Sequence, residues 1–144
     1  MNKQSSHSQG DAASMFGLIQ AARALEDRLE SSLGEVQLSL TKQAVLTALV
    51  QSNEPLTLGE LATAVACVRS NMTQVVDRLE GDGLVKRVAD PSDRRVVRAQ
   101  LTEAGVGRQG EGQKRLDRIQ AEFSASTSAS ERAAIDRMAA AFAK

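Results

Sequence analysis

Apolar residues recur along this 144-residue chain mostly with the period of amphipathic helices. Near the N-terminus their spacing alternates between three and four residues, through Met15, Leu18, Ala22, Leu25 and Leu29. This spacing is typical of a helix that packs lengthwise against another helix. Leu33 continues the pattern, and Gly34 is expected to end the helix.

A second helix is expected after Thr41, whose hydroxyl can cap its N-terminus. Its apolar face comprises Val45, Leu46, Leu49 and Val50. The run 53–55, Asn-Glu-Pro, then breaks the chain.

Two short amphipathic helices separated by a tight turn come next. Thr57 and Glu60 form a capping box at the start of the first, because each can satisfy a free backbone N–H of the other. Helical spacing follows in Leu58, Leu61, Ala62 and Val65, and returns in Met72, Val75, Val76 and Leu79. Gly81 and Gly83 are expected to stop the second helix. This order predicts a helix-turn-helix.

A hairpin is predicted directly after these helices. Residues 84–88 and 96–101 read as two strands, and residues 89–93, Ala-Asp-Pro-Ser-Asp, have the composition of a turn. The exit of the loop carries Arg94 and Arg95, which an ordinary surface hairpin does not require.

Thr102 can cap a long helix that reaches to about Phe123. Its first half contains four glycines, each of which costs a helix about 0.5–1 kcal/mol relative to alanine: Gly105, Gly107, Gly110 and Gly112. They indicate either a loose helix start or a close backbone approach. A linker is expected over 124–130. A second capping box then begins a last helix with the apolar face Ile135, Met138, Ala139 and Phe142.

The composition is that of a globular domain, with 42% hydrophobic and 25% charged residues and a net charge of zero. No apolar run approaches the roughly 20 residues of a membrane helix. The first ten residues are polar and lack the apolar core of a signal peptide. We therefore expect a cytoplasmic protein whose residues 1–10 form a disordered tail.

The positive charge is concentrated locally. Residues 1–68 hold 4 basic and 7 acidic side chains, a net of −3, whereas residues 86–98 hold 5 basic and 2 acidic, a net of +3. A basic stretch on a neutral protein is typical of a nucleic-acid-binding face, although a solvated hairpin would also fit.

Several kinds of site are excluded by residue counts. With one cysteine, Cys67, and one histidine, His7, the chain cannot form an intramolecular disulfide or a Cys/His zinc cluster. The three phenylalanines lie outside the basic segment, which disfavours stacking on single-stranded nucleic acid. Phosphate-binding glycine motifs and nucleophile elbows are also missing from the sequence, so we expect neither a cofactor nor an enzyme.

The second short helix is a candidate groove reader. If its apolar face is buried, the opposite face presents the predicted major-groove contacts Arg69, Ser70, Asn71, Thr73 and Gln74. Asn and Gln can form two hydrogen bonds to an adenine edge, and Arg suits guanine or phosphate. Asp77, one turn further on, is expected to form an ion pair that holds the helix against the hairpin, and Arg78 to contact phosphate or do the same.

The hairpin is the second candidate contact. Arg94 and Arg95 lie where its tip would reach a narrow minor groove, whose negative potential attracts arginine. Asp93 is expected to brace an arginine. Lys86, Arg87 and Arg98 are the predicted phosphate contacts of the strands.

With these elements in place, the chain resembles the MarR family of bacterial transcription regulators. The resemblance is carried by Leu79-Glu80-Gly81-Asp82-Gly83-Leu84-Val85, by Asp90-Pro91-Ser92-Asp93-Arg94-Arg95 and by Leu101-Thr102-Glu103-Ala104-Gly105. It covers about residues 58–105 closely and the outer helices by pattern and length.

The resemblance implies a mostly α fold with a small β-hairpin wing. In this organisation residues 41–102 form a winged helix-turn-helix DNA-binding domain, and residues 11–40 and 103–144 form a helical dimerisation region. It further implies a homodimer on a palindromic operator, usually a repressor. Such a dimer is released by a small-molecule effector or by cysteine oxidation. The pair Asp93 and Arg95 matches the family's Asp-x-Arg wing motif, whose arginine enters the minor groove.

Two features depart from the family pattern. The glycines at 107, 110 and 112 exceed what its long helix usually holds, and Val68 stands where a capping residue often begins the recognition helix. Cys67 permits two interpretations: a redox-sensitive thiol near Arg69, or a small packing residue, which is favoured. A winged helix that binds protein and never DNA is the alternative function.

Overall fold

The computed structural model describes the backbone of residues 4–65 and 71–143, and side chains from Gly10 onward within these ranges. Its helices are α1 (Gln4–Gly34), α2 (Leu40–Ser52), α3 (Leu58–Ala64), α4 (Met72–Gly81), α5 (Glu103–Ser126) and α6 (Ala129–Phe142). Its strands are β1 (Leu56–Thr57), β2 (Val85–Ala89) and β3 (Val97–Leu101). The predicted fold class, mostly α with a small β wing, is confirmed.

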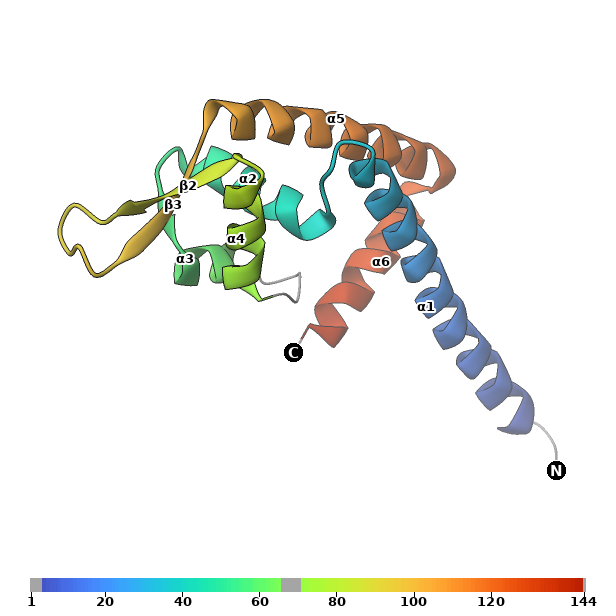
Figure 1. Ribbon diagram of the computed structural model, residues 1–144. Helices are drawn as coiled ribbons and strands as arrows, with labels where there is room; N and C mark the ends of the chain where they lie inside the picture. Colours follow the sequence, from blue (N-terminus) through green and yellow to red (C-terminus); the bar gives the residue numbers. More distant parts are fainter. Residues whose placement is uncertain (1–3, 66–70, 144) are drawn as a thin grey trace.

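The molecule consists of a head and a stem (Figure 1). We call residues 40–101 the head, and α1, α5 and α6 together the stem. The hairpin of β2 and β3, the wing, projects from one side of the head, and α5 runs from the end of β3 across to α1. Because α5 packs against both α1 and α2, it connects the head to the stem.

The sheet has three antiparallel strands in the order β1-β3-β2. Val85 pairs with Leu101 and Ala89 with Val97, so the wing is in continuous register, while Leu56 and Thr57 pair with Ala99 and Arg98. The sequence analysis missed β1, because two residues are too short for an alternating pattern.

The core lies in the head, where the predicted apolar faces meet. It consists of Leu33, Leu38, Val45, Leu46, Leu49, Leu61, Val65, Met72, Val75, Val76, Leu79, Leu84, Val85 and Ala99. All four apolar residues predicted for α4 belong to it, and their burial provides most of the stabilisation of so short a helix. Val50, which was expected on the apolar face of α2, is instead 39% exposed.

The helix termini differ from the expected ones at three places. Helix α1 begins at Gln4, within the segment expected to be a disordered tail, since extending an existing helix adds one hydrogen bond for each residue fixed. Ser39 rather than Thr41 caps α2, by accepting from the N–H of Lys42. Helix α5 continues to Ser126, into the expected linker. Both predicted capping boxes are present.

The glycines of α5 fall into two kinds. A Cβ on Gly105 would lie 2.0 Å from the main-chain oxygen of Leu84, and one on Gly112 would lie 2.1 Å from Oε1 of Gln43. Gly107 and Gly110 have nothing within 4 Å. The close-approach interpretation is therefore correct for Gly105 and Gly112, and the helix is continuous through all four positions.

The stem leaves a large apolar surface open in the single chain. Exposed hydrophobic side chains of α1 and α6 include Met15, Phe16, Leu18, Ile19, Leu25, Ile135, Met138 and Phe142. Monomers rarely expose so many grouped apolar side chains, which mark interaction surfaces. None of the helices in the described ranges has the length and hydropathy needed to cross a membrane.

Candidate DNA interface

Helix α4 presents its predicted polar face to solvent. Thr73, Gln74, Asp77 and Arg78 are all exposed, whereas the four apolar side chains on the opposite face are buried. The orientation follows from the 3.6-residue period, because the core can accept only one face. A row of hydrogen-bonding side chains thus lies on the outer surface of the head.

Asn71 has a structural role at the start of α4. Its Oδ1 accepts a hydrogen bond from the N–H of Thr73 at 3.1 Å, which makes Asn71 the N-cap. A bidentate contact with adenine needs both Oδ1 and Nδ2. Base reading by Asn71 would therefore compete with the cap, and its role as a direct reader stays a prediction.

Three predicted residues just before Asn71 cannot be placed. Cys67, Arg69 and Ser70 lie outside the described residues. Their predicted roles, as a redox-sensitive thiol and as groove contacts, remain predictions.

Arg87 joins the wing to α4. Its guanidinium forms ion pairs with Asp77 at 2.5 Å and with Glu80 at 2.8 Å, and Glu80 also accepts from the N–H of Arg87. These hydrogen bonds, that to Asp77 first, raise the pKa of Arg87. The ion pair expected for Asp77 is present. Arg87, which was predicted to contact phosphate, instead has both ends of its guanidinium engaged by carboxylates.

Arg98 on β3 also binds two carboxylates. It contacts Oδ2 of Asp90 at 2.5 Å, Oε2 of Glu60 at 3.1 Å and the main-chain oxygen of Pro55 at 3.3 Å. The hydrogen bond from Arg98 is the main cause that lowers the pKa of Asp90. A phosphate would have to displace these acceptors. The structure thus gives Arg98 an internal role, and its phosphate contact stays a prediction.

Glu60 connects this network to α3. Its carboxylate accepts from the N–H of Thr57 at 2.7 Å, and this capping-box bond is the first cause that lowers the pKa of Glu60. The same carboxylate contacts Arg98. The wing is therefore tied to the N-terminus of α3 as well as to α4, which restricts its angle to the head.

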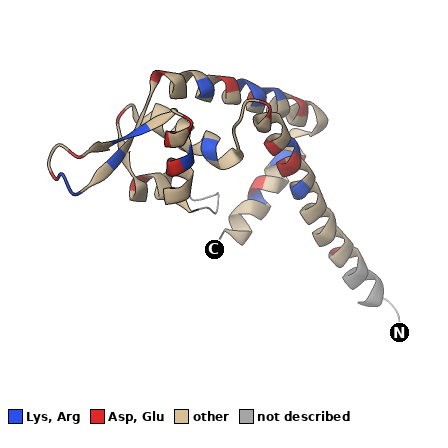
Figure 2. Ribbon diagram, viewed as in Figure 1, with Lys and Arg blue, Asp and Glu red and all other residues tan. Residues whose placement is uncertain are grey.

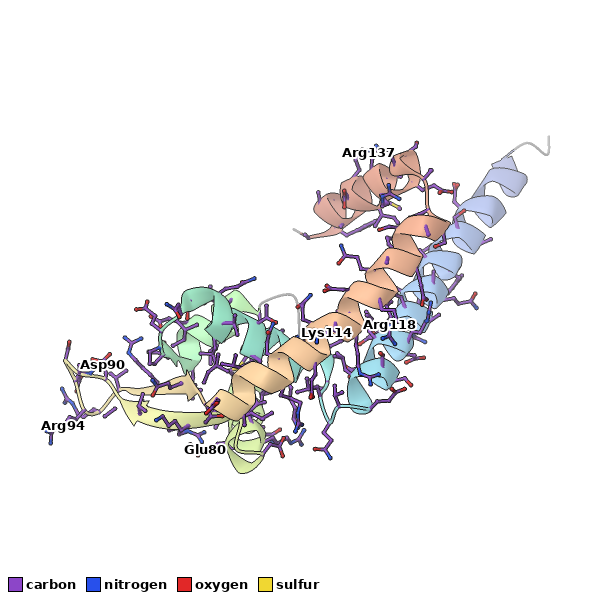
Figure 3. The ribbon with its side chains drawn as sticks, turned by 90° about the horizontal axis from the view of Figure 1, so that it is seen from above. Glu80, Asp90, Arg94, Lys114, Arg118 and Arg137 are labelled. Atoms are coloured by element: carbon purple, nitrogen blue, oxygen red, sulfur yellow. The ribbon has the colours of Figure 1, made fainter. Side chains whose placement is uncertain are left out.

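The tip of the wing carries the two remaining arginines. Figure 3 shows Arg94 at the far end of the hairpin. Arg95 has a side chain that is 92% exposed, and Asp93 accepts from both its N–H and its Nε–H. The expected bracing of an arginine by Asp93 is present. Arg95 thus extends from an ordered turn into solvent.

Figure 2 marks the basic residues of α4 and the wing, and these residues differ in how many carboxylates they contact. Within the described ranges, Arg78, Lys86 and Arg94 are exposed and take part in no ion pair. Arg87 and Arg98 are about three-quarters buried as side chains. On the head and wing, the accessible cations are therefore those at the wing tip and on the outer faces of α4 and β2.

A groove of about 570 Å³ lies between α2, α3 and α5. Its wall consists mainly of apolar and amide side chains: Leu40, Gln43, Ala44, Thr47, Ala48, Gln51, Ser52, Leu56, Glu60, Ala64, Val65, Gln113 and Leu116. Sequence analysis did not find it, because its residues come from three separate segments. Over the described part of the chain, no group of three His, Cys, Asp or Glu residues could hold a metal.

Comparisons with known proteins agree on one family. The MarR family model matches residues 38–97. The regulator MhqR of Bacillus subtilis is 34% identical over 90 residues, which are 62% of this chain and 61% of that protein. The regulator FarR of Neisseria gonorrhoeae is 32% identical over 105 residues, which are 73% of this chain and 68% of that protein. The chain thus matches less than two thirds of the length of MhqR.

Solved structures give the same result over a longer stretch. The transcriptional repressor CouR, solved bound to a 23-mer DNA duplex, superposes with a TM-score of 0.76 at 28% identity. The match covers 90% of this chain and 91% of CouR, so it includes the stem as well as the head. From its sequence matches and its fold, this chain belongs to the MarR family.

Proposed function

We propose that this protein is a sequence-specific double-stranded DNA-binding transcription regulator, a repressor that acts in the cytoplasm. The observation that carries the proposal is the exposed polar face of α4 beside a wing whose tip presents Arg94 and Arg95. A helix with such a face fits the major groove, and arginine at a hairpin tip fits the minor groove. The DNA-bound structure of CouR, a relative of the same fold, supports it.

The protein acts as a homodimer on a palindromic operator. The apolar faces of α1 and α6 are the surfaces that a second copy would cover, because both are exposed in the single chain. Twofold symmetry would then place two α4 helices in successive major grooves, about 34–36 Å apart.

The contacts divide into three groups. Thr73 and Gln74 read bases from the first turn of α4, together with Arg69 and Ser70 from the segment before it. Arg94 and Arg95 enter the minor groove. Arg78 and Lys86 bind phosphate, while Asp77, Arg87, Asp90 and Arg98 hold the wing in place.

A small-molecule effector releases the DNA. The groove between α2, α3 and α5 has the volume and the largely apolar wall of a small-molecule site. The wall of this groove includes residues of both the head and the stem. A bound molecule would release DNA if it binds more tightly to the dimer in which the two heads are wrongly spaced for DNA. Oxidation of Cys67 is the second route. If peroxide releases DNA from the wild-type chain but not from the Cys67→Ser variant, the oxidation route operates; if peroxide has no effect on either, release depends on the small molecule.

The test is a titration of the full chain on the DNA upstream of its own gene at several salt concentrations. For a dimer that neutralises 6–10 phosphates, affinity should fall roughly 10³–10⁵-fold between 50 and 200 mM salt. A scrambled duplex of equal length is the control. Affinity that ignores both salt and sequence, or no retardation at all, would contradict the proposal.

A further inference from the structure

Gln43 is a buried polar side chain of the head. It lies on α2 with 1% of its surface exposed, and its Nε2 donates to the main-chain oxygen of Gln109 on α5 at 3.0 Å. Within the described structure its Oε1 has no hydrogen-bond partner. A side chain held with one bond made and one carbonyl unsatisfied is costly, so it persists where its surroundings fix it.

Gly112 provides the space that Gln43 occupies. A Cβ at this position would lie 2.1 Å from Oε1 and 2.7 Å from Cδ of Gln43, and 2.8 Å from Cδ1 of Leu38. The amide therefore lies directly against the backbone of α5, and any side chain at position 112 would have to displace it. Gly110, two residues earlier on the same helix, faces open space.

Two polar contacts set the register between α2 and α5. Besides the bond from Gln43, Nε2 of Gln109 donates to Oγ1 of Thr47 at 3.3 Å, one turn further along α2. The apolar contacts between the two helices are close-packed, and a directed hydrogen bond together with a side chain seated in a glycine gap further restricts them to one arrangement. The head is thereby held at one position along the helix that carries it to the stem.

We propose that Gln43 and Gly112 form a positioning contact that sets the angle of the head on the stem. In the dimer this angle determines the separation of the two α4 helices. The inference rests on the proposed function only for its consequence on DNA. Gln43 also lines the groove between α2, α3 and α5, so an occupant of the groove touches the side chain that sets the angle.

The decisive comparison is Gly112→Ala against Gly110→Ala in the full chain. Both add one methyl group to the same helix, but only the first displaces Gln43. For Gly112→Ala we expect at least tenfold weaker binding to the fragment that wild-type protein protects, and unchanged weak binding to a single half of that fragment. Gly110→Ala should behave as wild type on both. A purely structural defect would weaken both DNAs equally.

A rescue tests whether the clash is with Gln43. The double variant Gln43→Ala/Gly112→Ala removes the clashing amide and should recover at least part of the lost affinity relative to Gly112→Ala alone. Should Gly112→Ala not fold, Gln43→Ala carries the test, because it removes the contact without adding atoms.

A distance measurement tests the contact without DNA. Spin labels at the exposed positions Ala62 of α3 and Gln120 of α5, in a Cys67→Ser chain diluted with unlabelled protein, report the head-to-stem distance. We expect a shifted or broader distribution for Gly112→Ala and Gln43→Ala, and the wild-type one for Gly110→Ala. Identical distributions in all four proteins would overturn the positioning contact even if DNA binding is intact. If the two variants shift the distance distribution but the wild-type protein does not bind DNA, only the proposed function would be overturned.

Discussion

Nε of Arg98 on β3 donates a hydrogen bond to Oδ2 of Asp90, at 2.5 Å, across the base of the wing loop. Oδ1 of Asp90 accepts from the N–H groups of Ser92 and Asp93, so one carboxylate orders the turn and joins it to the strand. Its side chain is 11% exposed. Asp90 thus orders the start of the turn that presents the arginines at the tip, while Asp93 braces Arg95 within it.

Acid should loosen the wing through Asp90. Its pKa is lowered, chiefly by the hydrogen bond from Arg98, so its contribution to stability is complete above its ordinary value of 3.8 and is lost as pH falls through the lower folded value. Urea unfolding at pH 7 and between pH 4 and 2 measures this. Asp90→Asn should be less stable than wild type at pH 7, and the difference should shrink at the acidic end. An equal difference at every pH would contradict this role.

Arg95→Ala and Gln74→Ala should each weaken DNA binding while leaving the melting temperature unchanged, because both side chains point to solvent. A base contact is worth about 1–3 kcal/mol, which is roughly a five- to hundredfold loss of affinity. Fluorescence anisotropy with operator DNA measures it. The control is Arg137→Ala, the same loss of charge on α6 and far from the wing (Figure 3). Unchanged affinity in the double variant would mean that the groove assignment is wrong.

Lys86 and Arg87 are neighbours on β2 with different expected roles. Lys86→Ala should reduce the salt dependence of DNA binding by about one ion per protomer, or about two per dimer, and leave stability unchanged. Arg87→Ala leaves Asp77 and Glu80 without their shared partner, so it should lower stability as well. Thermal melting together with binding at three salt concentrations separates the two. If Lys86→Ala were the destabilising variant, the assignment of roles would be reversed.

Gly105→Ala and Gly107→Ala should change stability in opposite directions. The new Cβ at 105 meets a backbone oxygen, which cannot move aside, and overpacking of this kind costs about 1–3 kcal/mol. The one at 107 meets nothing and should gain about 0.5–1 kcal/mol from helix propensity. Chemical denaturation of both variants measures the difference. Two variants of equal stability would show that the close approach of α5 to Leu84 is not maintained in solution.

A charge on the apolar face of α1 should separate the dimer. Phe16 is 60% exposed in the single chain, and Phe16→Glu places a charge where a second copy would pack. Sedimentation velocity should show a shift from dimer to monomer. Val97→Glu, the same kind of change at an exposed residue of β3, should remain dimeric. A wild-type chain that is monomeric at micromolar concentration would contradict the proposed dimer directly.

Much of this protein could be predicted from its sequence, because the relevant signals are local. The apolar period of Met72, Val75 and Leu79 determines which face of α4 is buried, and the cap pairs Thr57–Glu60 and Ser128–Glu131 mark where two helices begin. The turn composition around Asp90 likewise predicts the wing. These features depend on residues a few positions apart, so the chain itself specifies them.

Only the tertiary structure decided which cations are accessible and which glycines are required. Lys86 and Arg87 are adjacent basic residues for which the same phosphate contact was predicted, yet Arg87 is paired because α4 brings two carboxylates beside it. Gly112 and Gly110 are likewise indistinguishable until Gln43, 69 residues away from Gly112, is packed against one of them. Such distinctions depend on contacts between distant segments, whose geometry is set by the packing of the whole core rather than by any local pattern.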